Sequence, residues 1–137
     1  MLQKTEGIVL KTLKYSESSV ITKIFTREHG LNSFIIPGIR SSKNKPKSNL
    51  FQPLQILELD VYYHPHKSLL KLKEFRPGII YTNLYTDMIR QSIAIFAIEV
   101  FTKCIHENEV NENLYDYTRA FLLDIDKTSA SKNIMPH

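Results

Sequence analysis

The sequence predicts a small five-stranded barrel over residues 1–80, followed by an α-helical segment over residues 81–137. Before Gly78, five segments alternate apolar and polar side chains with the period of two that is typical of strands covered on one face. A longer connection separates the third of these segments from the fourth. After Gly78 the period changes to that of a helix. A closed or nearly closed barrel is favoured over a flat sheet, whose long edges would invite aggregation.

The first three strands are expected at residues 5–14, 20–26 and 31–36. A polar turn at 15–19 joins the first two, and its serines can bond to nearby backbone. Gly30 stands in the turn before the third strand, where a hairpin needs a residue that tolerates a positive φ. We therefore expect a positive φ at Gly30.

The fourth strand is expected at residues 57–63, and the fifth begins at Leu70. The turn between them contains His64 and His66, which invite a metal-binding interpretation because imidazole is a common ligand. The two histidines flank a proline and no third ligand is near them in sequence, so a plain hairpin turn is favoured.

The connection at residues 39–49 holds four cations, no anion and almost no apolar side chain. Such a segment buries too little surface to offset its ordering entropy, and we expect a mobile surface loop. Its cations, with three on the fifth strand and one at the turn before Gly30, are the candidate nucleic-acid-binding residues. They are Arg27, Arg40, Lys43, Lys45, Lys47, Lys71, Lys73 and Arg76. Tyr62 and Phe75 are candidate stacking platforms for bases, with core or rim packing as the alternative for each and core packing favoured for Phe75.

A first helix is expected from Leu84 to about His106, capped by Thr82 or Asn83. Its expected apolar face is formed by Met88, Ile89, Ile93, Phe96, Ala97, Val100 and Phe101. A second helix is expected at residues 112–125, with its apolar face formed by Leu114, Tyr117, Phe121 and Leu122. Because the first helix is apolar nearly all round, it needs neighbours on two sides. Residues 81–137 are therefore expected to begin a larger helical domain.

Charge divides the chain. Residues 1–80 carry 13 Lys and Arg against 6 Asp and Glu, whereas residues 81–137 carry 5 against 8. A basic first part favours a polyanionic partner, and a solvated basic surface is the alternative. The sequence has no signal-peptide pattern and no apolar stretch of membrane-spanning length, which predicts a cytoplasmic protein.

Catalysis and metal binding find little support in the sequence. The single cysteine, Cys104, excludes an internal disulfide and a four-cysteine zinc site, and is interpreted as a buried apolar residue. The four glycines form no phosphate-binding loop, and no nucleophile stands beside a base. The chain is therefore predicted to be no enzyme and to need no cofactor.

Six short motifs, in order and at similar spacing, resemble the RecO family of recombinational repair mediators. They are Thr5-Glu6-Gly7-Ile8-Val9-Leu10, Tyr15-Ser16-Glu17, Phe25-Thr26-Arg27-Glu28-His29-Gly30-Leu31, Gly38-Ile39-Arg40, Phe51-Gln52-Pro53-Leu54 and Leu57-Glu58-Leu59. The resemblance covers residues 1–76 and extends only as topology over 84–125.

This resemblance implies an all-β five-stranded OB-fold barrel followed by an α-helical segment. It also implies a non-enzymatic mediator that binds single- and double-stranded DNA, anneals strands and assists recombinase loading. The implied partners are a RecR-type protein and single-strand-binding protein. Arg27, Arg40 and the lysines after Arg40 would then belong to the DNA-binding surface. Family members are longer, and some carry a four-cysteine zinc site that this chain lacks.

Two other functions stay open from the residues alone. An OB-type barrel could bind RNA, because stacking and phosphate contacts suit both nucleic acids. Alternatively, the basic loop could bind an acidic partner peptide.

Overall fold

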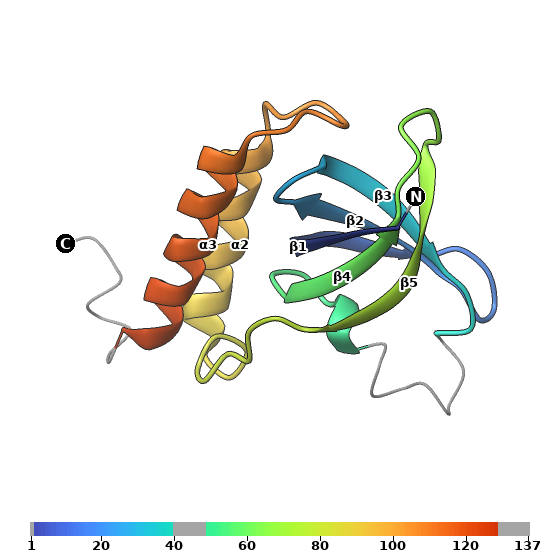
Figure 1. The fold of residues 1–137 in the computed structure, drawn as a ribbon. Coiled ribbons are helices and arrows are strands. Elements are labelled where there is room, and N and C mark those ends of the chain that lie inside the picture. Colours follow the sequence, from blue (N-terminus) through green and yellow to red (C-terminus); the bar gives the residue numbers. More distant parts are fainter. Residues whose placement is uncertain (1, 40–48, 129–137) are drawn as a thin grey trace.

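The computed structural model describes residues 2–39 and 49–128, and shows a barrel with two helices against one side (Figure 1). In chain order the elements are β1 (Leu2–Lys14), β2 (Val20–Thr26), β3 (Gly30–Ile36), the 3-10 turn η2 (Asn49–Phe51), β4 (Ile56–Tyr62), β5 (Leu69–Pro77), α2 (Met88–Thr102) and α3 (Glu112–Lys127). The five strands close in the order β1-β2-β3-β5-β4. The predicted fold, an OB-fold barrel followed by a helical segment, is confirmed.

The barrel is closed by a short parallel ladder between β3 and β5. Only Ser33–Ile35 of β3 pair with Leu69–Lys71 of β5, whereas the other four ladders are antiparallel and longer. The strand β1 begins three residues before the predicted start, because Leu2 already pairs with Tyr62 of β4. A register shift between Val9 and Lys11 bends β1, so that one strand can serve both β4 and β2.

Two apolar cores follow from the pleat of the strands. Inward side chains fill the barrel; they include Val9, Ile24, Phe34, Phe51, Leu57 and Leu70. A second core lies between the outside of the barrel and the helices, and includes Ile8, Phe25, Leu31, Ile56, Ala94, Tyr115 and Leu122. The helices also pack on each other, with the ring of Phe101 5.3 Å from Tyr117 and 5.5 Å from Phe121. The helical segment is thereby fixed to the barrel.

Gly30 has φ of 72°, as predicted. The turn before it is held by side chains: Thr26 Oγ1 donates to the Gly30 carbonyl at 2.7 Å, and Asn32 Nδ2 donates to the His29 carbonyl at 2.7 Å. A Cβ built on Gly30 would lie 2.3 Å from the carbonyl oxygen of Glu109, in the connection between α2 and α3. Gly30 is therefore needed for its conformation and also for the close approach of the helical segment.

The predicted bounds of the first helix are wrong at both ends. α2 begins at Met88 because Asp87 caps it, its carboxylate accepting from the backbone N–H groups of Ile89 and Arg90. Residues 82–84 lie before the helix, and their N–H groups donate to the carboxylate of Asp126 on α3 at 2.8 to 3.0 Å. The helix ends at Thr102 rather than near His106.

The predicted apolar face of this helix is also wrong. The buried side chains of α2 are Arg90, Ala94 and Ile98, spaced by four. Arg90 is buried because its guanidinium donates to Asp87 at 2.9 Å and to the Ile125 carbonyl at 2.7 Å. The predicted face stays largely exposed; its exposed members are Met88, Ile89, Phe96 and Val100. Because the helix is apolar nearly all round, the spacing of its apolar residues does not indicate which side is buried.

α3 begins at the predicted residue, Glu112, after the cap Asn111, and continues to Lys127. Its predicted face is partly wrong: Leu122 is buried, but Tyr117 is 60% exposed. The apolar residues buried against the barrel are Tyr115, Leu122 and Ile125. Cys104 is exposed, contrary to prediction, because α2 ends before it and leaves it in a turn.

No helix in residues 2–39 and 49–128 has the length and apolar character needed to cross a membrane. The same part of the chain holds no group of three or more His, Cys, Asp or Glu placed to bind a metal. His64 and His66 lie in the turn between β4 and β5, as expected.

Candidate nucleic-acid interface

Lys71 and Lys73 lie exposed on the outside of β5. The pleat of the strand turns Leu70 into the barrel core, so that the lysines beside it face solvent. Within the part of the chain that the structure describes, neither ammonium group forms a salt bridge. Their charges are therefore available to a polyanion.

Arg76 and Arg27 are both engaged by carboxylates. Arg76 Nε lies 3.0 Å from Glu58 Oε1, and its Nη1 lies 3.7 Å from the buried carboxylate of Asp60. Arg27 stands at the junction of barrel and α3, with Nε 2.8 Å from Asp116 Oδ1. The hydrogen bond that Arg27 donates to Asp116 is the main reason that the pKa of Arg27 is raised.

The other four candidates, Arg40, Lys43, Lys45 and Lys47, lie outside the described residues. Ile39 precedes these four residues in the sequence and Phe51 follows them, and both are buried in the barrel core.

The strand pairing places five outward side chains side by side around the barrel. Leu13 pairs with Ile21, Ile21 with Ile35, Ile35 with Lys71, and Lys71 with Tyr62. We call this row the outer strip. Neighbouring strands lie about 4.8 Å apart, so the row extends about 19 Å along the sheet. Leu13, Lys71 and Tyr62 are exposed, and Ile21 and Ile35 are half-buried.

A second row runs beside the outer strip. Lys11 pairs with Lys23, Lys23 with Ser33, and Ser33 with Leu69. Lys23 Nζ lies 3.9 Å from Glu107 Oε1, an exposed pair whose strength is small. The outer strip, which itself contains Lys71, is therefore bordered by the amines of Lys11 and Lys23.

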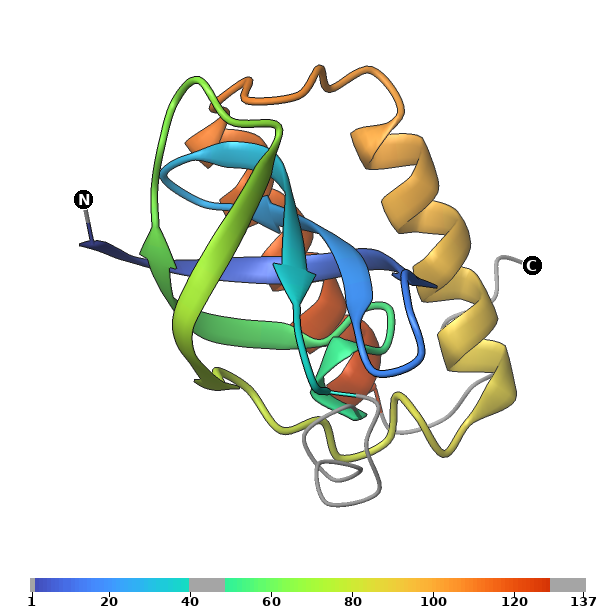
Figure 2. The ribbon, with the colours of Figure 1, turned by 90° about the vertical axis from the view of Figure 1, so that its right-hand side faces the viewer.

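The outer strip avoids the helices. The helix-facing core takes Phe25 and Leu31 from the same outward face of β2 and β3, but from the opposite ends of these strands. Figure 2 looks onto β3 and β5, with α3 behind the barrel. In an OB-fold the face of the second and third strands, with the loops between strands one and two and between strands four and five, binds oligonucleotides. Ile21 and Ile35 of the outer strip belong to these two strands.

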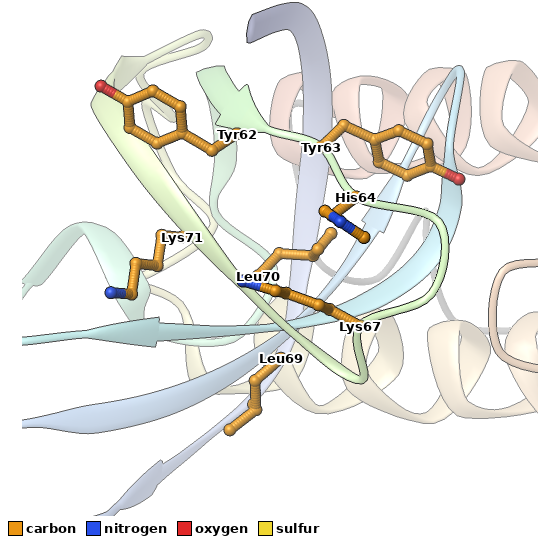
Figure 3. A pocket seen from close by; sticks show the side chains of 7 residues that line it. All are labelled: Tyr62, Tyr63, His64, Lys67, Leu69, Leu70 and Lys71. Atoms are coloured by element: carbon orange, nitrogen blue, oxygen red, sulfur yellow. The ribbon is translucent and has the colours of Figure 1, made fainter. Parts of the chain in front are cut away.

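A hollow of about 160 Å³ lies at the Tyr62 end of the outer strip (Figure 3). Its lining includes Tyr62, Tyr63, Lys67, Leu70 and Lys71. Tyr62 and Lys71 project to one side of the hairpin and Tyr63 to the other.

The aromatic candidates differ in their surroundings. Tyr63 stacks on His29 with ring centroids 4.2 Å apart, and burial lowers the pKa of that histidine. Phe75 packs on Phe51 at 4.7 Å and belongs to the barrel core, as the alternative expectation held. Tyr62 is 48% exposed and enters no ring pair among the described residues.

Sequence reasoning missed part of this surface. It singled out Lys71, Lys73 and Tyr62, but passed over Lys11, Leu13, Lys23, Ile21 and Ile35. The signal for these five was the alternation of the first three strands. That alternation shows which residues of a strand point outward. Which outward residues of different strands lie side by side depends on the order and register of the strands in the sheet.

Comparison with known proteins agrees with this fold. The family model described as "Recombination protein O N terminal" matches residues 1–78. The DNA repair protein RecO of Bacteroides fragilis is 37% identical over 131 residues, 96% of this chain and 54% of the relative. The proteins of the same name from Flavobacterium psychrophilum and Porphyromonas gingivalis are 34% identical over 120 residues (87% of this chain, 50% of the relative) and 33% identical over 128 residues (90% and 51%). The chain spans about half the length of the curated relatives it matches. It therefore belongs to the recombination protein O family, whose N-terminal region corresponds to its barrel.

Proposed function

We propose that this chain is a DNA-binding part of a DNA repair protein, and that the outer strip with Lys71 and Lys73 holds the DNA. One observation carries the proposal: Lys71, which forms no salt bridge within the described chain, pairs across the strands with exposed Tyr62 on the outer face of an OB-fold, and Lys73, likewise without a salt bridge there, follows on the same strand. Basic groups that follow the backbone, together with aromatic surfaces for bases, are the means by which such folds bind nucleic acid.

The two kinds of side chain have separate tasks in this proposal. Lys11, Lys71 and Lys73 neutralise phosphates, which gives affinity that depends on salt and little on base sequence. Leu13, Ile21 and Ile35 offer apolar surface for the bases. Loop residues Arg40, Lys43, Lys45 and Lys47 extend the phosphate contacts. Arg27 and Arg76 contribute less, because neighbouring carboxylates already neutralise them.

The repair role rests on the relatives, which carry the name DNA repair protein RecO. For the whole protein we propose binding of single- and double-stranded DNA, strand annealing and help in recombinase loading, without catalysis. A RecR-type protein and single-strand-binding protein are the proposed partners. These roles come from the family resemblance.

A salt series tests the proposal. Binding of a labelled oligothymidylate is measured for the parent chain and for Lys71→Ala/Lys73→Ala. If each lysine meets one phosphate, the slope of log affinity against log salt should flatten by about 1.4. The control Lys103→Ala/Lys127→Ala removes the same charge from exposed positions at the ends of the helices and should leave the slope unchanged. Equal slopes for both variants would contradict the proposal.

A second variant tests the loop. Lys43→Ala/Lys45→Ala/Lys47→Ala should flatten the slope by roughly 2 and weaken binding equally for every base sequence. The same series with an RNA of equal length and with an acidic peptide distinguishes the alternatives. If the RNA or the peptide binds more tightly than the DNA, that molecule and not DNA is the ligand of this surface.

A further inference from the structure

The hollow beside Tyr62 has the form of a site for a single planar ring. Its volume of about 160 Å³ is close to that of a protein cavity of about 150 Å³ that accepts one benzene molecule. Leu69 and Leu70 contribute apolar walls, and the hollow is open to solvent rather than enclosed.

Tyr62 is placed to supply a flat surface there. It is the last residue of β4 and pairs with Lys71 on one side and with Leu2 on the other. Its neighbour Tyr63 is already stacked on His29, whereas the ring of Tyr62 has no aromatic partner among the described residues. Figure 3 shows Tyr62 and Lys71 directed to the same side of the hairpin.

Charges at the rim fit a nucleotide rather than a neutral ring. Lys67 and Lys71 both line the hollow, and neither forms a salt bridge within the described part of the chain. No Asp or Glu belongs to the lining. A base placed against Tyr62 would therefore have amines within reach of its flanking phosphates.

We propose that this hollow is a stacking subsite for one unpaired pyrimidine-sized base, which gives the barrel a preference for single strands over duplex. The inference rests on the proposed DNA-binding function. In a duplex both faces of each base are already stacked, so the Tyr62 contact is open only to a base outside a duplex. Stacking of a base on an aromatic side chain contributes about 1–3 kcal/mol.

The chain contains no tryptophan, so Tyr62→Trp places a single indole in the subsite. Oligothymidylate should quench its fluorescence, and a duplex of equal length should leave it nearly unchanged. Tyr117→Trp, on the exposed side of α3, is the control and should respond to neither. Quenching by both DNAs to the same extent, or by neither, would overturn the subsite.

Affinity measurements separate this inference from the proposed function. Tyr62→Ala should weaken single-strand binding by about 5- to 100-fold. It should leave duplex affinity and the salt slope unchanged, and Tyr62→Phe should restore binding. If the parent chain binds no DNA, the proposed function fails. If it binds DNA with the expected salt slope but Tyr62→Ala affects single strands and duplex alike, or neither, only the subsite fails.

Discussion

Arg27 and Asp116 join the barrel to α3 through two hydrogen bonds, Nε to Oδ1 at 2.8 Å and Nη2 to Oδ2 at 3.0 Å. Beside them Glu6 accepts from Tyr115 Oη at 2.7 Å and from Arg119 Nε at 2.7 Å. Glu6 and Arg27 both belong to the motifs that resemble the RecO family. In this structure they connect the barrel with the helical segment.

Arg27→Ala should therefore lower stability and leave the salt slope of DNA binding unchanged. The carboxylate of Asp116 would lose its partner, and α3 one of its connections to β2. Thermal unfolding and the salt series measure the two effects. Unchanged stability together with a flatter slope would instead support the phosphate contact that the sequence suggested for Arg27.

Asp126→Asn should reduce the free energy of unfolding by about 1.5–3 kcal/mol at neutral pH, the range for hydrogen bonds to a charged group. Burial opposes ionisation of Asp126, but the N–H groups of Thr82, Asn83 and Leu84 outweigh it and lower its pKa. Asp124→Asn, an exposed position on the same helix, is the control and should change little.

The effect of Asp126→Asn should depend on pH in one direction. A carboxyl whose pKa is lowered by folding stabilises the protein above its unfolded pKa, about 3.9, and loses that contribution as the pH falls. The two proteins should differ most above about pH 5, and the difference should shrink as the pH falls below about 3.9 toward the lowered pKa of the folded state. Denaturant unfolding across this pH range measures this. A difference that persists unchanged in acid would show that the charge is not the cause.

Gly30→Ala should destabilise more than Gly38→Ala, by at least about 1 kcal/mol. Both glycines have φ of 72°, so both variants incur the backbone strain of about 1–2 kcal/mol. At Gly38 a Cβ meets no described atom within 4 Å, but at Gly30 it collides with the Glu109 carbonyl. If urea unfolding shows the same loss of unfolding free energy for both variants, the connection between α2 and α3 moves away from the added Cβ without loss of stability.

The exposed apolar face of α2 should make this chain self-associate. We propose that residues 81–137 begin a larger helical domain, which would cover Met88, Phe96 and Val100. Phe96→Glu/Val100→Lys should reduce association and dye binding, whereas Ser18→Glu, in the exposed turn between β1 and β2, should not. A monodisperse parent chain that binds no hydrophobic dye at high concentration would contradict this.

Local patterns predicted the barrel well. The strands alternate cleanly, and Gly30 stood where a turn needs it, so their positions could be read to within a few residues. The start of α2 could not, because Thr82, Asn83 and Asp87 are all capable of capping a helix and the structure uses Asp87. Its buried face was missed because Arg90 is buried only through partners that folding brings to it.

The candidate site was predictable only in part. Lys71 and Tyr62 could be found because each lies on the exposed face of an alternating strand. Their adjacency to Ile35 requires the parallel pairing of β3 with β5, which no local pattern encodes. Likewise, nothing near Arg27 in sequence indicates that Asp116 will neutralise it.

The most direct test of the central claim is a map of backbone amide shifts in the ¹⁵N-labelled chain during titration with oligothymidylate at low salt. We predict that the shifts concentrate on the outer strip and its border, with Lys11, Ile21, Ile35, Tyr62 and Lys71 among them. The amides of α2 should stay unchanged. Binding that shifts the amides of α2 and α3, but leaves β3 and β5 unaffected, would contradict the account.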